Sequence, residues 1–250
     1  MALVTDLSSH LALITGATGG IGHATSLALA RLGCSVAVHY HSASDTAFSL
    51  VSTLQSMGVR AAAFRAVLSS YAETRELHAA VVRELGNPTI LFNNAGTTLG
   101  KSGVTDVSDV SVDGFEATWR ANCGTPFLLT QLCVPATLDK GWGRLVFCSS
   151  VAGFTGGVIG PHYASSKSAI HGLVHWLANA YGKRGITVNG VAPALIEDTK
   201  MLPSAPDLAA KIPIGRLGKP DEIAETVVWI VKTGYVHNKV VAVDGGMFIQ

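Results

Sequence analysis

Short apolar runs alternate with longer segments of helical periodicity along almost the whole chain. The apolar runs predict strands at residues 11–14, 35–40, 61–64, 89–92, 144–148, 186–189 and 240–243. A helical stretch ends near residue 32, and further helices are predicted at 45–57, 73–85, 115–138, 163–181 and 221–232. Strands that are apolar on both faces and alternate with helices indicate a doubly wound parallel sheet with helices on both faces. We expect a single α/β domain over residues 1–250.

This architecture also predicts where a ligand binds. In open parallel sheets the ligand lies beyond the carboxyl ends of the strands. The chemistry should therefore be carried by the residues that directly follow the predicted strands.

The first strand runs into a glycine-rich loop. Glycines permit a sharp turn and a close approach of the backbone to a ligand, and the start of the next helix suits a pyrophosphate. The spacing is G-x-x-x-G-x-G rather than the G-x-G-x-x-G dinucleotide fingerprint, so a simple helix-packing turn remains an alternative. The expected cofactor contacts are Gly16, Thr18, Gly20, Ile21 and Gly22.

The second strand ends in Tyr40-His41-Ser42, where the adenosine ribose of a dinucleotide is expected. A carboxylate here would favour NAD, and the first one is Asp45. Its absence permits the 2′-phosphate of NADP, to which His41 and Ser42 can donate hydrogen bonds. No arginine stands in this segment. We therefore favour NADP over NAD, with a plain polar strand end as the alternative.

Ser150 follows the fifth predicted strand, and Tyr163 and Lys167 stand four residues apart at the start of a helix. Four-residue spacing places both side chains on one helical face. A phenol with its ordinary pKa of about 10 is a poor acid near neutral pH, and a neighbouring ammonium favours the phenolate. Such a tyrosine can give a proton to a carbonyl oxygen that the serine also contacts. A Tyr-x-x-x-Lys spacing alone is usually structural, and its value comes from the glycine loop in the same chain.

Composition narrows the function classes. Of 250 residues 48% are hydrophobic and only 14% charged, with a formal net charge of +1. We expect no nucleic-acid partner, because such partners require a basic excess. Neither a membrane span nor a signal or transit peptide is predicted, so we expect a cytoplasmic protein. The four cysteines form no C-x-x-C pair, and no metal site is predicted.

Together these motifs resemble the short-chain dehydrogenase/reductase family from Leu11 almost to the end of the chain. The resemblance is carried by the glycine loop, Asn93-Asn94-Ala95-Gly96, Asn122, Ser150, Tyr163, Lys167, Pro193 and Val243-Asp244-Gly245-Gly246. It implies a Rossmann-type fold and an NAD(P)-dependent oxidoreductase acting on CH–OH and C=O groups.

The resemblance also implies roles for individual residues. Tyr163 would be the general acid, Lys167 would lower its pKa and bind the nicotinamide ribose, Ser150 would polarise the substrate carbonyl, and Asn122 would hold a water in a proton relay. The further cofactor contacts would come from Leu68, Asn94, Ala95, Gly96, Pro193 and Ile196. The chain departs from the family at Gly19, where relatives often have arginine, and at Val67 before Leu68, where an acidic adenine contact is usual.

Within the family the chain is most similar to 3-oxoacyl-acyl-carrier-protein reductases. This implies an NADPH-dependent ketoreductase of fatty acid synthesis that acts on a small ketone or an acyl thioester, with an acyl carrier protein as a candidate partner. Lys140, Lys183 and Arg184 are expected near ends of the helices that flank the site and could attract that acidic partner, with a solvated basic helix end as the alternative. Phe154, with Val158, Ile159 and His162, is expected to line the substrate mouth. The segment 194–213, which contains Pro203, Pro206 and Pro213, is a candidate lid.

Two other functions stay open. One is a general carbonyl or polyol dehydrogenase on the same scaffold, and the other is a non-catalytic nucleotide-binding scaffold. The low charge, the two long apolar helices and the resemblance predict a homotetramer.

Overall fold

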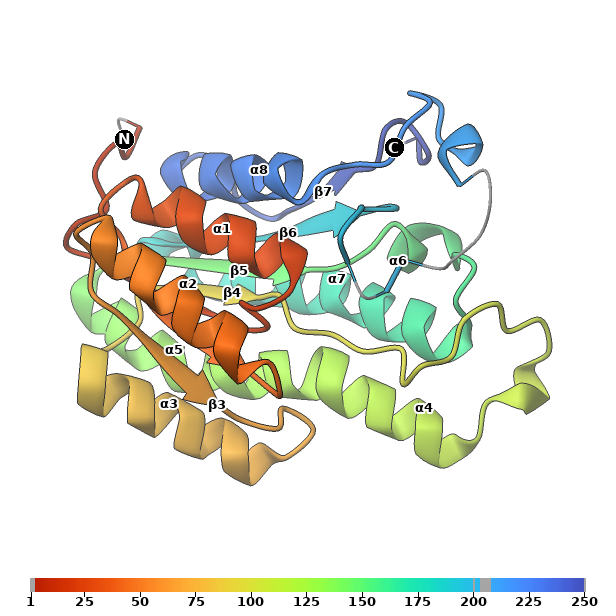
Figure 1. Cartoon of the computed structure of the whole chain (residues 1–250), viewed down its shortest axis with the longest axis horizontal. Helices are drawn as coiled ribbons and strands as arrows, with labels where there is room; N and C mark the ends of the chain where they lie inside the picture. Colours follow the sequence, from red (N-terminus) through yellow and green to blue (C-terminus); the bar gives the residue numbers. More distant parts are fainter. Residues whose placement is uncertain (1–2, 200, 203–207, 250) are drawn as a thin grey trace.

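A single parallel sheet forms the centre of the computed structural model, which describes residues 3–199, 201–202 and 208–249. Its strand order is β3-β2-β1-β4-β5-β6-β7, and Figure 1 shows the sheet between its layers of helices. The strands are β1 (Leu11–Ile14), β2 (Ser35–Tyr40), β3 (Ala61–Arg65), β4 (Ile90–Asn93), β5 (Gly143–Cys148), β6 (Ile186–Pro193) and β7 (Lys239–Val243). The seven predicted strands and their parallel arrangement are confirmed.

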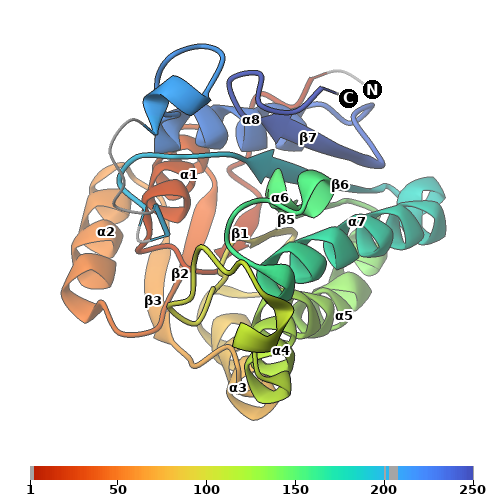
Figure 2. The same ribbon diagram turned by 90° about the vertical axis from the view of Figure 1, so that its right-hand side faces the viewer.

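Helices cover both faces of this sheet (Figure 2). One face carries α1 (Gly20–Ala30), α2 (Ser44–Ser56) and α8 (Pro220–Lys232). The other carries α3 (Tyr71–Leu85), α4 (Val112–Trp119), α5 (Thr125–Lys140) and α7 (Pro161–Tyr181). A short helix, α6 (Ala152–Thr155), lies between β5 and α7. The doubly wound architecture is therefore confirmed.

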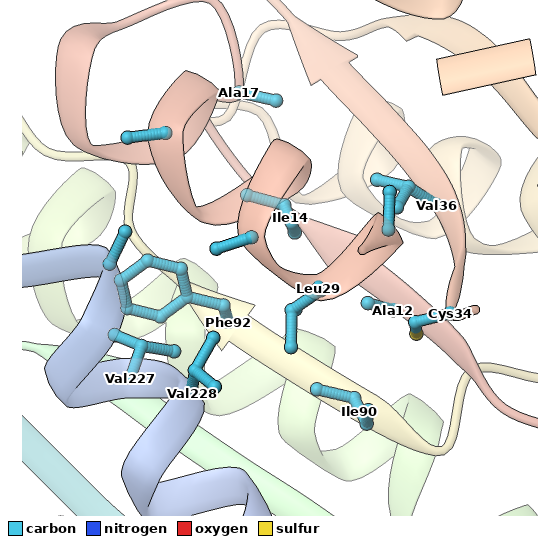
Figure 3. Close-up of a cluster of buried hydrophobic side chains, with 14 of the residues drawn as sticks. Ala12, Ile14, Ala17, Leu29, Cys34, Val36, Ile90, Phe92, Val227 and Val228 are labelled. Atoms are coloured by element: carbon cyan, nitrogen blue, oxygen red, sulfur yellow. The ribbon is translucent and has the colours of Figure 1, made fainter. Parts of the chain in front are cut away.

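The apolar faces of these helices form two cores, one on each side of the sheet. In one core, Leu29 of α1 and Val227 of α8 pack over Ile14 and Phe92, and all four side chains are completely buried (Figure 3). In the other, Leu129 of α5 and Val174 of α7 are completely buried against the opposite face. This two-sided burial explains why the strand sequences show no polar alternation.

The chain reverses its direction of travel across the sheet between β1 and β4. It leaves β1 toward β2 and β3, and then returns to place β4 on the other side of β1. A crevice for ligands forms at such a switch point, beyond the carboxyl ends of the two strands. The fold thus places the glycine loop after β1 beside Asn94 after β4.

The long helix predicted at 115–138 is divided in the structure. It consists of α4, a π-helical turn (Arg120–Gly124) and α5. Pro126, in the first turn of α5, has no N–H to donate to the carbonyl of Asn122, which accounts for the wider turn before it. Pro135 lies inside α5 without ending it. Asn122 therefore belongs to an irregular turn rather than to a regular helix.

Two further predictions meet the structure only in part. None of the described helices is long and apolar enough to cross a membrane. The candidate lid is described only in part, because Pro203 and Pro206 lie outside the described residues.

Candidate active site

A hydrogen-bond cluster joins the ends of β1 and β4 at the switch point. The Thr15 hydroxyl donates to the carbonyl of Phe92 and accepts the backbone N–H groups of Asn94 and Ala95, each at 2.9 Å. The Asn94 side chain donates to the carbonyls of Thr15 and Gly16 at 2.9 and 3.2 Å. Both strand ends are thus fixed relative to each other without any charged group.

The glycine loop ends in a helix start that fits a pyrophosphate. No side chain caps α1, and its first turn carries no acidic residue. The N–H groups of this first turn are therefore free to bind an anion. A Cβ at Gly22 would lie 2.4 Å from the carbonyl oxygen of Gly16, so only glycine fits there. Gly16 itself has a φ of 63°, in the left-handed region that favours glycine.

His39 is a functional residue that the sequence analysis missed. Its imidazole is 2% exposed and joins two loops of the crevice. Nδ1 accepts the backbone N–H of Gly16 at 2.9 Å, so Nε2 carries the proton and donates to the carbonyl of Ala66 at 3.1 Å. Burial lowers the pKa of His39 to about 4, which keeps the ring neutral. His39 thereby holds the first loop glycine against the end of β3.

The ends of β2 and β3 form the far side of the crevice. Tyr40 is buried, whereas His41 and Ser42 are exposed. The backbone N–H of Val67, which could have replaced the missing acidic adenine contact, donates instead to Glu73 Oε2 at 2.8 Å. Leu68 is half-buried, and its carbonyl accepts a hydrogen bond from Thr125.

Ser150, Tyr163 and Lys167 come together at the carboxyl end of β5, as predicted. The Ser150 hydroxyl forms a hydrogen bond with Tyr163. It also accepts the backbone N–H of Ala152 at 3.2 Å. Lys167 Nζ lies 5.6 Å from the centre of the Tyr163 ring and donates to the carbonyl of Cys148 at 2.7 Å. All three side chains therefore come from the β5 end and one face of α7.

The pKa of Tyr163 departs from its usual value in the direction opposite to the prediction. Burial raises it, the nearby Cys148 thiol raises it further, and the hydrogen bond with Ser150 lowers it only in part. Burial also lowers the pKa of Lys167. Lys167 is not among the groups that shift the Tyr163 pKa, and its ammonium donates to the carbonyl of Cys148. A phenol in this setting keeps its proton at neutral pH.

Asn122 is completely buried and uses its whole amide within the protein. Oδ1 accepts the N–H of Thr97 at 2.8 Å, and Nδ2 donates to the Thr97 carbonyl at 2.9 Å and to Ser166 Oγ at 3.0 Å. The side chain thus fixes the segment after β4 against α7, at the residue directly before Lys167. The water-binding role implied for Asn122 would fall to its backbone carbonyl, which Pro126 cannot reach with a hydrogen bond.

Pro193, the last residue of β6, and Ile196 border the same crevice. The carbonyl of Pro193 accepts the N–H of Val151 at 3.1 Å, which joins β6 to the Ser150 segment. The N–H of Ile196 has no partner among the described residues, and its carbonyl accepts the Thr199 hydroxyl at 2.8 Å. Ile196 therefore has a free backbone donor, as a contact to a carboxamide requires.

The expected substrate-mouth residues are differently placed. Phe154 stacks on Phe248 at 4.6 Å and packs against His171 at 4.3 Å, so its ring covers the C-terminal segment. His162 is 1% exposed, and its Nε2 contacts the Thr98 carbonyl. Its side chain is therefore buried beneath the segment after β4. Val158 is exposed. Hydrogen bonds from the N–H groups of Gly103 and Val104 to the carbonyls of Val158 and Ile159 join the two loops beside the site.

The three basic residues lie at ends of the flanking helices, as expected, but at the ends that are away from Tyr163. Lys140 ends α5 just before β5 begins. Its Nζ donates to the carbonyl of Ser9, which precedes β1 at the amino ends of the strands. Lys183 and Arg184 follow the C-terminal end of α7, twenty residues beyond Tyr163 and about 30 Å away along the helical segment. Their positions favour the alternative of solvated basic helix ends.

Comparison with known proteins identifies the fold and site. The family model described as short chain dehydrogenase matches residues 10–208. The chain belongs to the short-chain dehydrogenase family. It is 35% identical to the 3-oxoacyl-[acyl-carrier-protein] reductase FabG of Pseudomonas aeruginosa, over 98% of this chain and all of the relative. It is 29% identical to an L-rhamnose 1-dehydrogenase (NAD(P)(+)) of a Sphingomonas species, over 98% of both chains.

A solved structure supports the same assignment. The crystal structure of a blue fluorescent protein from a metagenomic library, in complex with NADPH, has a TM-score of 0.89 and 33% identity. The similarity covers 98% of this chain and all of that one. This short-chain dehydrogenase is thus an NAD(P)-dependent oxidoreductase that acts on CH–OH groups, and its recognition from sequence motifs is confirmed.

Proposed function

We propose that this protein is an NADPH-dependent ketoreductase that reduces a 3-oxoacyl or related ketone to the hydroxy product. The observation that carries the proposal is the convergence of Ser150, Tyr163 and Lys167 beside an uncapped glycine-loop helix. Ketone reduction requires a site for the cofactor phosphates and a proton donor, and both lie at the carboxyl ends of the strands.

Each residue of the site has its own part in the proposed reduction. Bound NADPH supplies the hydride. The Ser150 hydroxyl donates a hydrogen bond to the substrate carbonyl oxygen and orients it beside Tyr163. The raised pKa of Tyr163 keeps the phenol protonated, and the phenol gives its proton to that oxygen as negative charge develops there. Lys167 Nζ lies 5.6 Å from the centre of the Tyr163 ring, where its positive charge would act on the phenolate once the proton has left.

The cofactor residues proposed from sequence fit this arrangement. Gly16 and Gly22 shape the turn, and the free N–H groups at the start of α1 hold the pyrophosphate. Asn94, Ala95 and Gly96 continue along the cofactor toward Lys167, which also binds the nicotinamide ribose. A Cβ at Gly96 would lie 3.3 Å from Lys167 Nζ, so a side chain there would crowd that ribose position.

Turnover of a 3-oxoacyl thioester tests the reaction directly. Purified protein should consume NADPH, followed by absorbance, with an acetoacetyl thioester and with ethyl acetoacetate. Tyr163→Phe should lose turnover while it retains NADPH binding. Unchanged turnover in that variant would refute the proton-donor role, and binding of NADPH without turnover of any ketone would leave a nucleotide-binding scaffold.

The polyol dehydrogenase alternative is supported by the similarity to L-rhamnose 1-dehydrogenases. The same protein should therefore be assayed with L-rhamnose and NADP in the oxidation direction. A kcat/KM on the sugar above that on the thioester would replace the ketoreductase proposal. A comparison of free thioester with acyl carrier protein thioester would then test whether the carrier protein itself is a partner.

We further propose a homotetramer. Val112 of α4 and Phe127 of α5 are 72% and 51% exposed, and the α4–α5 face has a hollow of about 520 Å³ whose walls include Phe115 and Trp119. Burying such apolar area against a second copy of the chain is favourable. Sedimentation should give a tetramer and a smaller species for Phe127→Glu, whereas a wild-type monomer would refute the assembly.

A further inference from the structure

An arginine that is distant in sequence lies beside the end of β2. Arg65 is the last residue of β3, and Tyr40 is its register partner in the parallel pairing of the two strands. Register partners in neighbouring strands lie about 4.8 Å apart and point to the same face of the sheet. Arg65 is therefore next to the segment Tyr40-His41-Ser42, although the sequence shows no arginine there.

The guanidinium of Arg65 is available for a ligand. Arg65 is exposed, and among residues 3–199, 201–202 and 208–249 no carboxylate or carbonyl pairs with its side chain. The other arginine of this strand region behaves differently, because Arg60 Nη2 donates to the carbonyl of Glu84 at 3.1 Å. Arg65 thus presents five N–H donors without a structural task.

The surroundings of Arg65 suit a phosphate. The Tyr40 ring is buried and packs edge-on against Phe48 of α2. His41 and Ser42 are exposed and add further donors. The nearest carboxylate along this loop is Asp45, whose Oδ1 accepts a hydrogen bond from Ser44. No acidic residue stands between Tyr40 and Ser44 to repel an anion.

We propose that Arg65 binds the 2′-phosphate of NADPH and sets the preference for NADPH over NADH. The proposal rests on the proposed function, which places the adenosine ribose beyond the end of β2. A phosphate monoester there is a dianion whose oxygens match the planar guanidinium fork. Arg65 is thereby the specificity residue that the sequence around His41 lacks.

Direct binding measurements test the proposal without turnover. Dissociation constants for NADPH and NADH are measured by calorimetry on the whole protein, for wild type, Arg65→Gln and the matched control Arg60→Gln. A hydrogen bond to a charged group contributes about 1.5–3 kcal/mol, so Arg65→Gln should weaken NADPH binding by about 10-fold or more. NADH binding should stay within about 2-fold, and Arg60→Gln should leave both constants unchanged.

Each outcome decides between the two proposals. An unchanged ratio of NADPH to NADH affinity in Arg65→Gln, or a wild-type preference for NADH, overturns the role of Arg65. A selective loss of NADPH affinity in a protein that reduces no ketone supports Arg65 and refutes the ketoreductase proposal. If Arg65→Gln fails to fold, the binding of 2′-AMP and of 5′-AMP is compared in wild type and in Arg65→Lys. The proposal requires 2′-AMP to bind more tightly than 5′-AMP, and equal binding of the two nucleotides overturns it.

Discussion

The buried imidazole of His39 makes stability depend on pH in a way that one substitution can isolate. In the folded protein burial lowers the His39 pKa from 6.5 to about 4. The unfolded chain therefore binds a proton at a higher pH than the folded one. The contribution of His39 to stability is complete above the unfolded pKa and is lost as the pH falls from 6.5 toward 4.

The size of this contribution follows from the two pKa values. A shift from 6.5 to about 4 corresponds to about 3 kcal/mol, because each pKa unit is worth about 1.4 kcal/mol. Between pH 7.5 and pH 5, linkage predicts that about 2 kcal/mol of this is lost. The ring is almost fully enclosed, so solvent screening reduces the effect little.

Two substitutions separate the hydrogen bonds of His39. Asn places an acceptor where Nδ1 contacts Gly16, whereas Gln places a donor where Nε2 contacts Ala66. Urea unfolding at pH 7.5 and pH 5 should show a pH-dependent loss about 2 kcal/mol smaller in both variants than in wild type. NADPH affinity should be retained in His39→Asn and reduced in His39→Gln, because only the second leaves the Gly16 N–H without an acceptor.

Equal pH dependence in wild type and both variants would contradict this reasoning, because it would place the titrating group elsewhere. His10 is the natural alternative, since its pKa is also lowered to about 4, by burial and by Lys140 and Arg144. His10→Gln is therefore the matched control. This substitution should alter the pH dependence of stability without affecting NADPH affinity. His10 contacts Thr89 and Trp142 at the amino ends of the strands, away from the crevice.

Three further predictions concern other parts of the fold. Thr15→Val should lower the free energy of unfolding, measured by urea titration, by about 2–4 kcal/mol, because two backbone N–H groups lose their acceptor. A loss below about 0.5 kcal/mol, as for an exposed substitution, would contradict a stabilising role for the hydrogen bonds around Thr15. Gly22→Ala should reduce NADPH affinity at least about 10-fold, because its Cβ would meet the Gly16 carbonyl, whereas Gly19→Ala finds only an ordinary contact and should bind normally; equal affinities would contradict the packing argument. Arg144→Met should cost about 3 kcal/mol in thermal or urea unfolding, since the buried guanidinium donates to a carbonyl at the end of α8, while the KM for NADPH stays unchanged.

Local sequence patterns were sufficient for the elements and for the residues that end strands. Each predicted strand matches a strand of the sheet within a few residues, because two-sided burial leaves an uninterrupted apolar run in the sequence. Ser150, Tyr163 and Lys167 were predicted to converge because a strand end and four-residue helical spacing fix their positions. The place of Asn94 along the cofactor was expected only from the family resemblance.

Contacts across the sheet could not be predicted in this way, because they depend on strand order and register. His39 reads as an ordinary polar strand residue until β1 and β3 are placed on either side of β2. Arg65 is close to His41 only through the β2–β3 register. The position of Lys140 is different in kind, because it follows from the order of the elements: a helix that ends just before a parallel strand ends near the amino end of that strand, away from Ser150.

The arrangement of the site explains how one scaffold accommodates different substrates. The proposed catalytic groups lie just beyond β5, in α7 and in the π-helical turn, and some are fixed by hydrogen bonds to the backbone, such as Lys167 to Cys148 and Asn122 to Thr97. The walls around Ser150 belong instead to loops joined by a few backbone hydrogen bonds, as between Gly103 and Val158. Changes in these loops alter the shape of the mouth without moving the proton donor. Relatives of comparable sequence similarity are accordingly named as a 3-oxoacyl reductase and as a rhamnose dehydrogenase. Substitutions in these loops, with activity measured on both substrates, should therefore change substrate preference.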